Sequence, residues 1–134
     1  PAFVVTWDGS GRPGVILTQS DIRQVQLAKG AIRAGIEVLL AKTGLKTSDL
    51  QTVLLAGAFG HYIDASSAIR IGLLPQLDPG RVRAVGNAAL AGARMILLDG
   101  RYRAKASGLA RSIRYIELAS EPMFEQAFPD AMEC

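Results

Sequence analysis

The stretch that decides the fold is Thr52-Val53-Leu54-Leu55-Ala56-Gly57-Ala58-Phe59-Gly60, an apolar run that ends in small residues. Consecutive apolar residues bounded by a glycine turn are typical of a strand buried on both faces. In an open α/β sheet, ligands gather beyond the carboxyl ends of strands, and a glycine-rich turn there leaves backbone N–H groups uncovered for a phosphate. The stretch predicts a nucleotide loop, although any strand-to-helix turn in an α/β protein also needs small residues.

Length and composition favour one folded domain. The chain has 134 residues, enough for a single core, and its 49% hydrophobic against 20% charged residues argue against disorder. No apolar run approaches membrane-spanning length and no signal-peptide pattern opens the chain, so we expect a cytoplasmic protein without membrane contacts. Because the chain opens directly in a strand, we expect residues 1–134 to be a single domain excised from a larger protein.

The charged and metal-binding residue types exclude several functions. The net charge of +3 comes from arginines between Arg81 and Arg114, where only Tyr102 is an interleaved aromatic residue. We therefore expect no nucleic acid binding, although such a patch can steer an acidic partner.

Cys134 is the single cysteine and His61 the single histidine, so neither has a partner of its own type at metal-ligand spacing. We predict no metal site and no catalytic residue in the chain.

Periodicity and turn residues predict the order of the elements. The patterns indicate strands at 3–7, 15–17, 53–56, 81–86 and 115–118, and helices at 21–43, 64–72, 87–93, 101–112 and 121–128. This order, β, β, α, β, α, β, α, α, β, α, predicts an α/β fold with a mixed sheet flanked by helices.

The longest predicted helix is apolar nearly all round and is expected to be almost engulfed. Its one polar stripe consists of Gln26, Lys29, Arg33 and Glu37, and Gly30 lies beside that stripe, where it lets another group approach the helix backbone closely. The stripe has two interpretations. It is either a narrow solvent-facing seam with an Arg33–Glu37 pair, or Gln26 and Lys29 form one wall of a ligand cleft.

A second informative stretch is Val85-Gly86-Asn87-Ala88-Ala89-Leu90-Ala91-Gly92-Ala93. Small side chains such as Ala88 and Gly92 let a helix lie very close to a neighbour, at a cost of about 1 kcal/mol for the interior glycine relative to alanine. Such packing suits a hinge. Asn87 is first of all a helix cap, and a direct ligand contact is its secondary interpretation.

Taken together, four motifs closely resemble the C-terminal region of the corrinoid-protein reductive activators. They occur in that family's order and cover about residues 15–128; the motifs are 18–32 (TQSDIRQVQLAKGAI), 55–60 (LAGAFG), 71–75 (IGLLP) and 85–93 (VGNAALAGA). The family's large domain is similar to the acetate and sugar kinase, heat-shock chaperone and actin superfamily, in which two ribonuclease-H-like halves close on ATP. The resemblance implies that this chain is the second half of such an actin-like ATPase domain.

The resemblance also implies roles for particular residues. Residues 55–60 look like the adenosine motif, and those expected to lie against the nucleotide are Gly57, Ala58, Phe59 and Gly60. The helix that borders adenine and ribose is expected to contribute Gln26, Lys29 and Gly30. The connecting helix on which the halves hinge is expected to include Gly86, Asn87, Ala88 and Gly92. Ala58 departs from the kinases of the superfamily, which usually have a second glycine there.

Activators of this family couple ATP to one-electron reduction of a Co(II) corrinoid protein to Co(I). The resemblance therefore implies ATP with Mg²⁺ in the complete protein, an iron–sulfur cluster in a missing upstream segment, and no cofactor bound by this chain alone. The expected partners are a corrinoid protein of a methyltransferase system and the missing N-terminal half, with a homodimer as a further expectation. The alternatives are a small-molecule kinase half-domain of the same superfamily and a non-catalytic interaction module.

Overall fold

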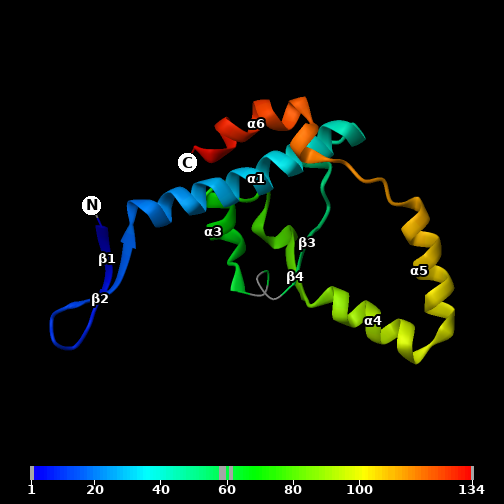
Figure 1. The fold of residues 1–134 in the computed structure, drawn as a ribbon, viewed down its shortest axis with the longest axis horizontal. Helices are drawn as coiled ribbons and strands as arrows, with labels where there is room; N and C mark the ends of the chain where they lie inside the picture. Colours follow the sequence, from blue (N-terminus) through cyan, green and yellow to red (C-terminus); the bar gives the residue numbers. More distant parts are fainter. Residues whose placement is uncertain (1, 58–59, 61, 134) are drawn as a thin grey trace.

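The computed structural model describes residues 2–57, 60 and 62–133. The described elements are arranged along one long helix, with a hairpin at one end and a pair of helices projecting beyond the other (Figure 1). Their bounds are β1 (Ala2–Trp7), β2 (Pro13–Thr18), α1 (Gln19–Thr43), β3 (Val53–Ala56), α3 (Ala65–Arg70), β4 (Val82–Gly86), α4 (Ala88–Leu98), α5 (Gly100–Ser112) and α6 (Pro122–Met132), with 3₁₀ turns at Thr47–Asp49, Pro79–Arg81 and Leu118–Ser120. The α/β class is confirmed.

The opening hairpin forms as predicted, with β1 antiparallel to β2. Asp8 organises its turn, because Oδ1 accepts hydrogen bonds from the backbone N–H of Ser10 at 2.9 Å and of Arg12 at 2.8 Å. These hydrogen bonds to the charged form hold the pKa of Asp8 below its usual value, with the Arg12 N–H as the largest cause. The turn therefore fixes the pairing of the two strands.

Helix α1 begins and ends where its capping residues lie. Thr18 and Asp21 form a reciprocal capping box at the start, and Gly44 ends the helix at φ 70°. The expected near-engulfment is wrong. The buried face consists of Lys29, Gly30, Ala34, Gly35 and Val38, whereas apolar side chains elsewhere on the helix are about half exposed: Val25, Leu27, Ile32 and Leu39.

The strands form two separate two-stranded sheets rather than one mixed sheet. Strands β3 and β4 pair in parallel, with Val53 opposite Val82 and Leu55 opposite Ala84. The physical reason for the separation is the length of α1, whose 25 residues span about 37 Å at 1.5 Å per residue. The helix thus carries the chain away from the hairpin before β3 begins.

The predicted strand at 115–118 is wrong. Residues 113–117 have no strand assignment and lead from α5 to a 3₁₀ turn at Leu118–Ser120, where the chain returns to α1 (Figure 1). At that turn a Cβ added at Gly35 would lie 3.2 Å from Leu118 Cδ1. Residues 115–118 therefore lead the chain back to helix α1. The predicted helix at 121–128 is α6, which extends to Met132.

The buried core is small for a chain of this size. It is centred on Ala68, Ile69 and Leu74, with Ile36 and Leu55 among the half-buried residues packed against it. The total accessible surface is 10014 Å². A compact monomer of 14.2 kDa exposes about 6,800 Å² by the usual scaling with mass. The fold is consequently open and leaves broad apolar faces on β1, β2, α4 and α5 uncovered within the described residues.

Candidate nucleotide site at the ends of the parallel strands

Two glycines with left-handed backbones mark the carboxyl ends of β3 and β4. Gly57 has φ 93° and Gly86 has φ 63°, conformations that favour glycine over any residue with a side chain. The ladder shifts register here, so that Ala56 lies opposite Gly86, and the Gly57 N–H donates to the Gly86 carbonyl at 2.7 Å. Apart from the adjoining residues of the chain, no described atom lies within 4 Å of a Cβ built on either glycine. The strand ends therefore open onto space where α/β proteins collect ligands.

The predicted loop does not present all of its backbone to that space. The expectation of a bare amide is not met at Gly57, because its N–H is already bonded to Gly86. Gly60 is buried, and a Cβ there would lie 3.0 Å from Leu55 Cβ. Gly60 thus packs against strand β3. Ala58 and Phe59 lie outside the described residues.

Helix α3 joins this edge to α1. Asp64 caps α3, which the sequence predicts to begin at residue 64. Its carboxylate accepts from the Ser67 N–H at 2.7 Å, and this hydrogen bond is the largest cause that lowers the pKa of Asp64. The helix leads to Gly72, which has φ 77°. A Cβ built on Gly72 would lie 3.4 Å from Lys29 Nζ. The predicted nucleotide residues are therefore divided between the strand ends and α1, with α3 connecting the two places.

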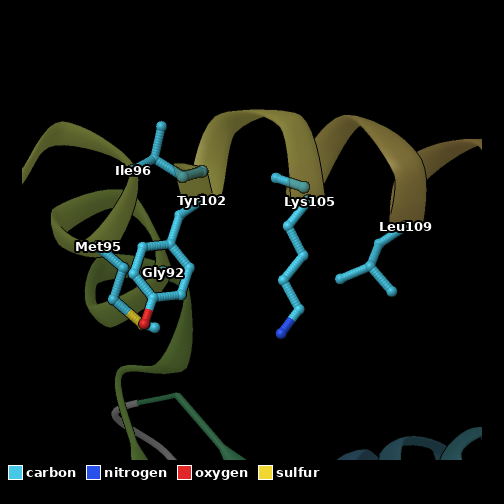
Figure 2. A pocket seen from close by; sticks show the side chains of 7 residues that line it. Gly92, Met95, Ile96, Tyr102, Lys105 and Leu109 are labelled. Carbon is cyan, nitrogen blue, oxygen red and sulfur yellow. The ribbon is translucent and has the colours of Figure 1, made fainter. Parts of the chain in front are cut away.

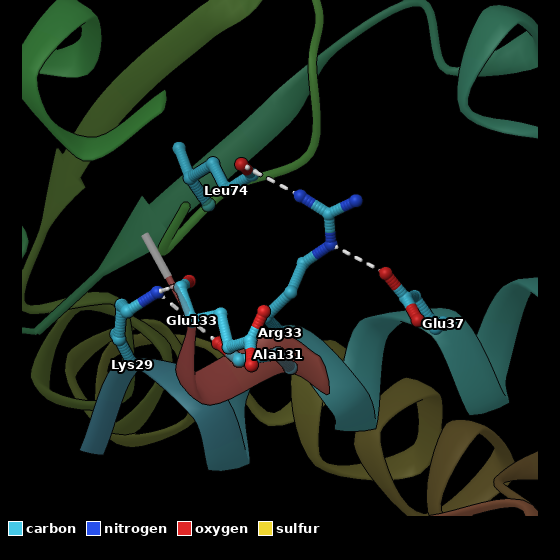
Figure 3. Close-up of polar contacts among 6 residues, drawn as sticks. All are labelled: Lys29, Arg33, Glu37, Leu74, Ala131 and Glu133. Atoms are coloured by element: carbon cyan, nitrogen blue, oxygen red, sulfur yellow. Dashed lines mark hydrogen bonds and ion pairs between the residues drawn. The ribbon is translucent and has the colours of Figure 1, made fainter. Parts of the chain in front are cut away.

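Lys29, Arg33 and Glu37 of the polar stripe of α1 form polar contacts (Figure 3). Arg33 Nε lies 2.7 Å from Glu37 Oε1, which confirms the expected pair, and Arg33 Nη1 donates to the Leu74 carbonyl at 3.1 Å. Arg33 therefore ties α1 to the chain that follows α3. The stripe is a structural seam between elements at this end rather than a fully solvated face.

Lys29 and Gly30 contact helix α6. Lys29 is 2% exposed, and its Nζ donates to the carbonyl oxygens of Ala131, at 3.2 Å, and of Glu133 (Figure 3). A Cβ at Gly30 would lie 2.8 Å from Met132 Cγ and 3.2 Å from Met132 N. Gly30 thus permits a close approach, as predicted, and the group that approaches is the last turn of α6. A cation at the carboxyl end of a helix is also favoured by the helix dipole.

Gln26 lies at a small apolar cavity. Its lining comprises Leu17, Ile22, Val25, Gln26, Lys29 and Ile71, and its volume is about 130 Å³. Cavities that enclose whole small-molecule ligands measure about 300–1,000 Å³. This cavity therefore suits only part of a ligand.

The predicted hinge residues lie at the start of α4. Asn87 caps the helix, its Oδ1 accepting from the Leu90 N–H at 2.9 Å, and Ala88 is the first helical residue. No described atom lies within 4 Å of a Cβ built at Gly92. The capping role of Asn87 is confirmed, and the described residues leave open space beside Gly92.

Among residues 2–57, 60 and 62–133, no group of three or more His, Cys, Asp or Glu side chains is placed to hold a metal ion. In the same part of the chain, no helix is both long and apolar enough to cross a membrane.

The whole chain, residues 1–134, matches a protein family described as the C-terminal domain of RACo, the ASKHA domain. The chain belongs to this family. Among solved structures, the reductive activator for corrinoid, iron-sulfur protein matches it with a TM-score of 0.84 and 36% identity, over 98% of this chain and 21% of that chain. The arrangement of elements in this chain is therefore shared with that solved structure.

Two curated relatives are similar to this chain in sequence. The corrinoid activation enzyme RamQ of Eubacterium limosum is 43% identical over 114 residues, which cover 85% of this chain and 19% of the relative. The [Co(II) methylated amine-specific corrinoid protein] reductase of Methanosarcina barkeri is 37% identical over 87 residues, which cover 65% of this chain and 16% of the relative. The chain thus spans about a fifth of the length of the proteins it matches.

Sequence reasoning missed two features of this site. One is the hydrogen bond between Gly57 and Gly86 at the ends of β3 and β4. Each of these strands is followed by a glycine in the sequence, and the helix between the strands predicts that they pair in parallel. The other is the docking of α6 on α1. Its signal was Gly30, which leaves room for Met132 of α6, together with Gly35, which leaves room for Leu118 in the turn before α6.

Proposed function

We propose that this chain forms part of the nucleotide-binding domain of an ATP-dependent activator that returns corrinoid proteins from Co(II) to Co(I). The observation that carries the proposal is the open strand edge at Gly57 and Gly86, in a chain of the RACo ASKHA-domain family. Relatives named for corrinoid activation and for reduction of a Co(II) corrinoid protein support the same reaction class. The complete protein is proposed to act in the cytoplasm.

The open edge fits a nucleotide in a specific way. Without side chains at Gly57 and Gly86, a flat ring or ribose can approach the backbone there. Ala58 and Phe59 are proposed to contact the same part of the nucleotide. Gln26 is proposed to contact the adenine and ribose portion from the small cavity beside α1. Lys29 and Gly30 are proposed to act indirectly, by fixing α6 against the helix that carries Gln26.

ATP is proposed to act through conformation. A nucleotide held between this chain and a preceding half of the domain stabilises the closed state to the extent that it binds that state more tightly. Residues 86–92, where β4 passes into α4, are proposed as the hinge. Mg²⁺ and the electron for cobalt are proposed to be held by other parts of the complete protein, so this chain alone is not expected to hydrolyse ATP.

Substitution of Gly57 by aspartate in the complete protein tests the proposal. The side chain would occupy the open edge against which the ring or ribose is proposed to lie, so we expect ATP affinity to fall at least about tenfold, a change of about 1.4 kcal/mol. Gly44→Asp is the matched control, because Gly44 has a similar backbone, φ 70°, and the same open space but ends α1. Calorimetric titration of ATP that gives equal affinities for wild type and Gly57→Asp would overturn the nucleotide site.

The reaction itself is tested by mixing the reduced complete protein with a Co(II) corrinoid protein and ATP. Formation of Co(I), followed by its absorption spectrum, is the expected result. Phosphate transfer to a sugar or an acid without any cobalt reduction would show that the complete protein is a kinase instead.

A further inference from the structure

The polar face of α1 follows the loop after α3 turn by turn. From one turn of α1 to the next, the residues that meet are Gln26 with Ile71, Lys29 with Gly72, and Arg33 with Leu74. The first pair lines one cavity, the second is separated by 3.4 Å between Nζ and a Cβ built on the glycine, and the third forms a hydrogen bond of 3.1 Å. Positions three and four apart share one face of a helix. The loop at 71–74 therefore lies along the face of α1 that carries Gln26.

Leu74 is the residue at which three elements meet. Its N–H donates to the Ala68 carbonyl of α3 at 3.2 Å, and its own carbonyl accepts from Arg33 of α1. Its side chain is 3% exposed and belongs to the core cluster against which Leu55 of β3 packs. Because Pro75 follows, the backbone of Leu74 is restricted to extended conformations, which limits the directions in which its carbonyl can point. The Leu74 carbonyl is thus a well-fixed anchor for α1.

Arg33 is oriented toward this anchor by Glu37. Its Nε lies 2.7 Å from Glu37 Oε1, and Figure 3 shows the guanidinium between the glutamate and Leu74. A planar guanidinium donates to a carboxylate and to a carbonyl at the same time, whereas an ammonium group is a single point of charge. The Arg33 side chain is 24% exposed, and Ile36 also packs against the core cluster from α1. Arg33 therefore sets the angle of α1, and the apolar contact of Ile36 keeps the helix docked without it.

A basic side chain on α5 offers a contrast. Lys105 lines a cavity of about 210 Å³ between α4 and α5, together with Tyr102 and Leu109 (Figure 2). Within the part of the chain that the structure describes, Lys105 forms no hydrogen bond and no ion pair. It therefore carries the same charge as Arg33 without joining two elements.

We infer that Arg33 is a positioning residue of the proposed nucleotide site. Through the Leu74 carbonyl, it fixes the distance between Gln26 on α1 and the strand edge at Gly57. The inference rests on the proposed function, under which the nucleotide lies between these two parts of the chain. Without the contact, α1 can tilt about its docking point at Ile36. Gln26 lies about 15 Å along the helix from that point, so a small tilt moves its side chain away from the nucleotide.

A double-mutant cycle in the complete protein tests the inference. Arg33→Met is combined with Gln26→Ala, and calorimetric titration measures the ATP affinity of the wild type, the two single variants and the double variant. We expect Arg33→Met to weaken ATP binding at least about fivefold when Gln26 is present and less than about twofold when Gln26 has been replaced. The reason is that a residue acting through the position of Gln26 has no effect once that side chain is gone.

Two further variants are matched controls. Arg81→Met removes the same type of side chain, whose Nη1 donates to the Leu50 carbonyl at 2.8 Å, before β3 begins and at the end of that strand away from Gly57. Lys105→Met removes a positive charge without breaking a polar contact. We expect both controls to change ATP affinity less than about twofold. Thermal unfolding checks that every variant is folded at the temperature of the titration.

Equal weakening by Arg33→Met with and without Gln26, or no weakening at all, would overturn the positioning role. The same holds if either control weakens ATP binding as much as Arg33→Met does. These outcomes leave the proposed function standing, because Gly57→Asp tests the nucleotide site separately. A wild-type complete protein that binds no ATP would overturn the proposed function and this inference together.

If Arg33→Met does not fold, Arg33→Lys takes its place in the cycle and is judged by the same outcomes. The lysine keeps the positive charge, but its ammonium group cannot reproduce the simultaneous contacts with Glu37 and the Leu74 carbonyl.

Discussion

At the scale of single residues, glycines in this chain serve opposite purposes. Gly30 is needed because another helix lies against it, with Met132 Cγ 2.8 Å from the position of an added Cβ. Gly108 lies inside α5 with no described atom within 4 Å of its added Cβ and no unusual backbone angle. The same substitution should therefore have opposite effects at the two positions.

We predict that Gly30→Ala lowers the free energy of unfolding and that Gly108→Ala raises it by roughly 0.5–1 kcal/mol. At Gly30 the same gain in helix propensity is outweighed by overpacking, which costs about 1–3 kcal/mol, because backbone atoms of Met132 must also move. Urea unfolding followed by circular dichroism measures both changes. Equal stabilisation by the two substitutions would contradict the close contact between α1 and α6.

At the scale of elements, α6 is held to α1 by two lysines in different surroundings. Lys29 is buried and bonds two main-chain carbonyls at the carboxyl end of α6, whereas Lys42, with 40% of its side chain exposed, pairs with Glu121 at 2.6 Å, just before α6 begins. Removing the hydrogen bonds of a buried donor is costly, while an ion pair that reaches solvent contributes little.

We predict that Lys29→Met destabilises the protein by roughly 1–3 kcal/mol and that Lys42→Met does so by less than about 1 kcal/mol. Hydrogen exchange should accelerate in residues 122–132 for the first variant and change little for the second. If Lys42→Met releases α6 as readily as Lys29→Met does, the buried contacts of Lys29 are not what holds the helix.

Much of this element scale was predictable because the signals are local. Thr18, Gly44, Asp64 and Asn87 end or begin helices through hydrogen bonds or backbone angles within a few residues of themselves. The open end of β3 at Gly57 was predictable for the same reason.

What failed depended on distant partners. The segment 115–118 alternates like a strand but pairs with no described strand, and the apolar positions of α1 stand exposed because no described element packs on them. The fate of Lys29 was set by Ala131 and Glu133, about a hundred positions along the chain. No periodicity within α1 contains that information.

At the scale of the whole molecule, the excess surface has a direct consequence for solution behaviour. Apolar side chains on β1, β2, α4 and α5 stand exposed, including Phe3, Trp7, Leu98 and Ile113. Burying such area contributes about 25 cal/mol per Å², so contact with another protein surface is favoured.

We predict that residues 1–134 expressed alone self-associate, because a second copy can cover these faces when nothing else does. Light scattering at increasing concentration should give an average mass that rises above the monomer value of 14.2 kDa. Residues 1–134 joined to the rest of the complete protein serve as the control and should show weaker concentration dependence. A mass that stays at the monomer value up to high concentration would contradict this prediction.

The separation of basic residues on α4 and α5 from the acidic residues of 117–133 gives the molecule an electric dipole in addition to its net charge of +3. An approaching charged protein therefore experiences a torque in addition to an attraction. Because the Debye length is about 8 Å at physiological ionic strength, that torque acts only in the last nanometre of approach. Rotational alignment should accordingly take place inside a loosely bound encounter pair, after diffusion has brought the two proteins together.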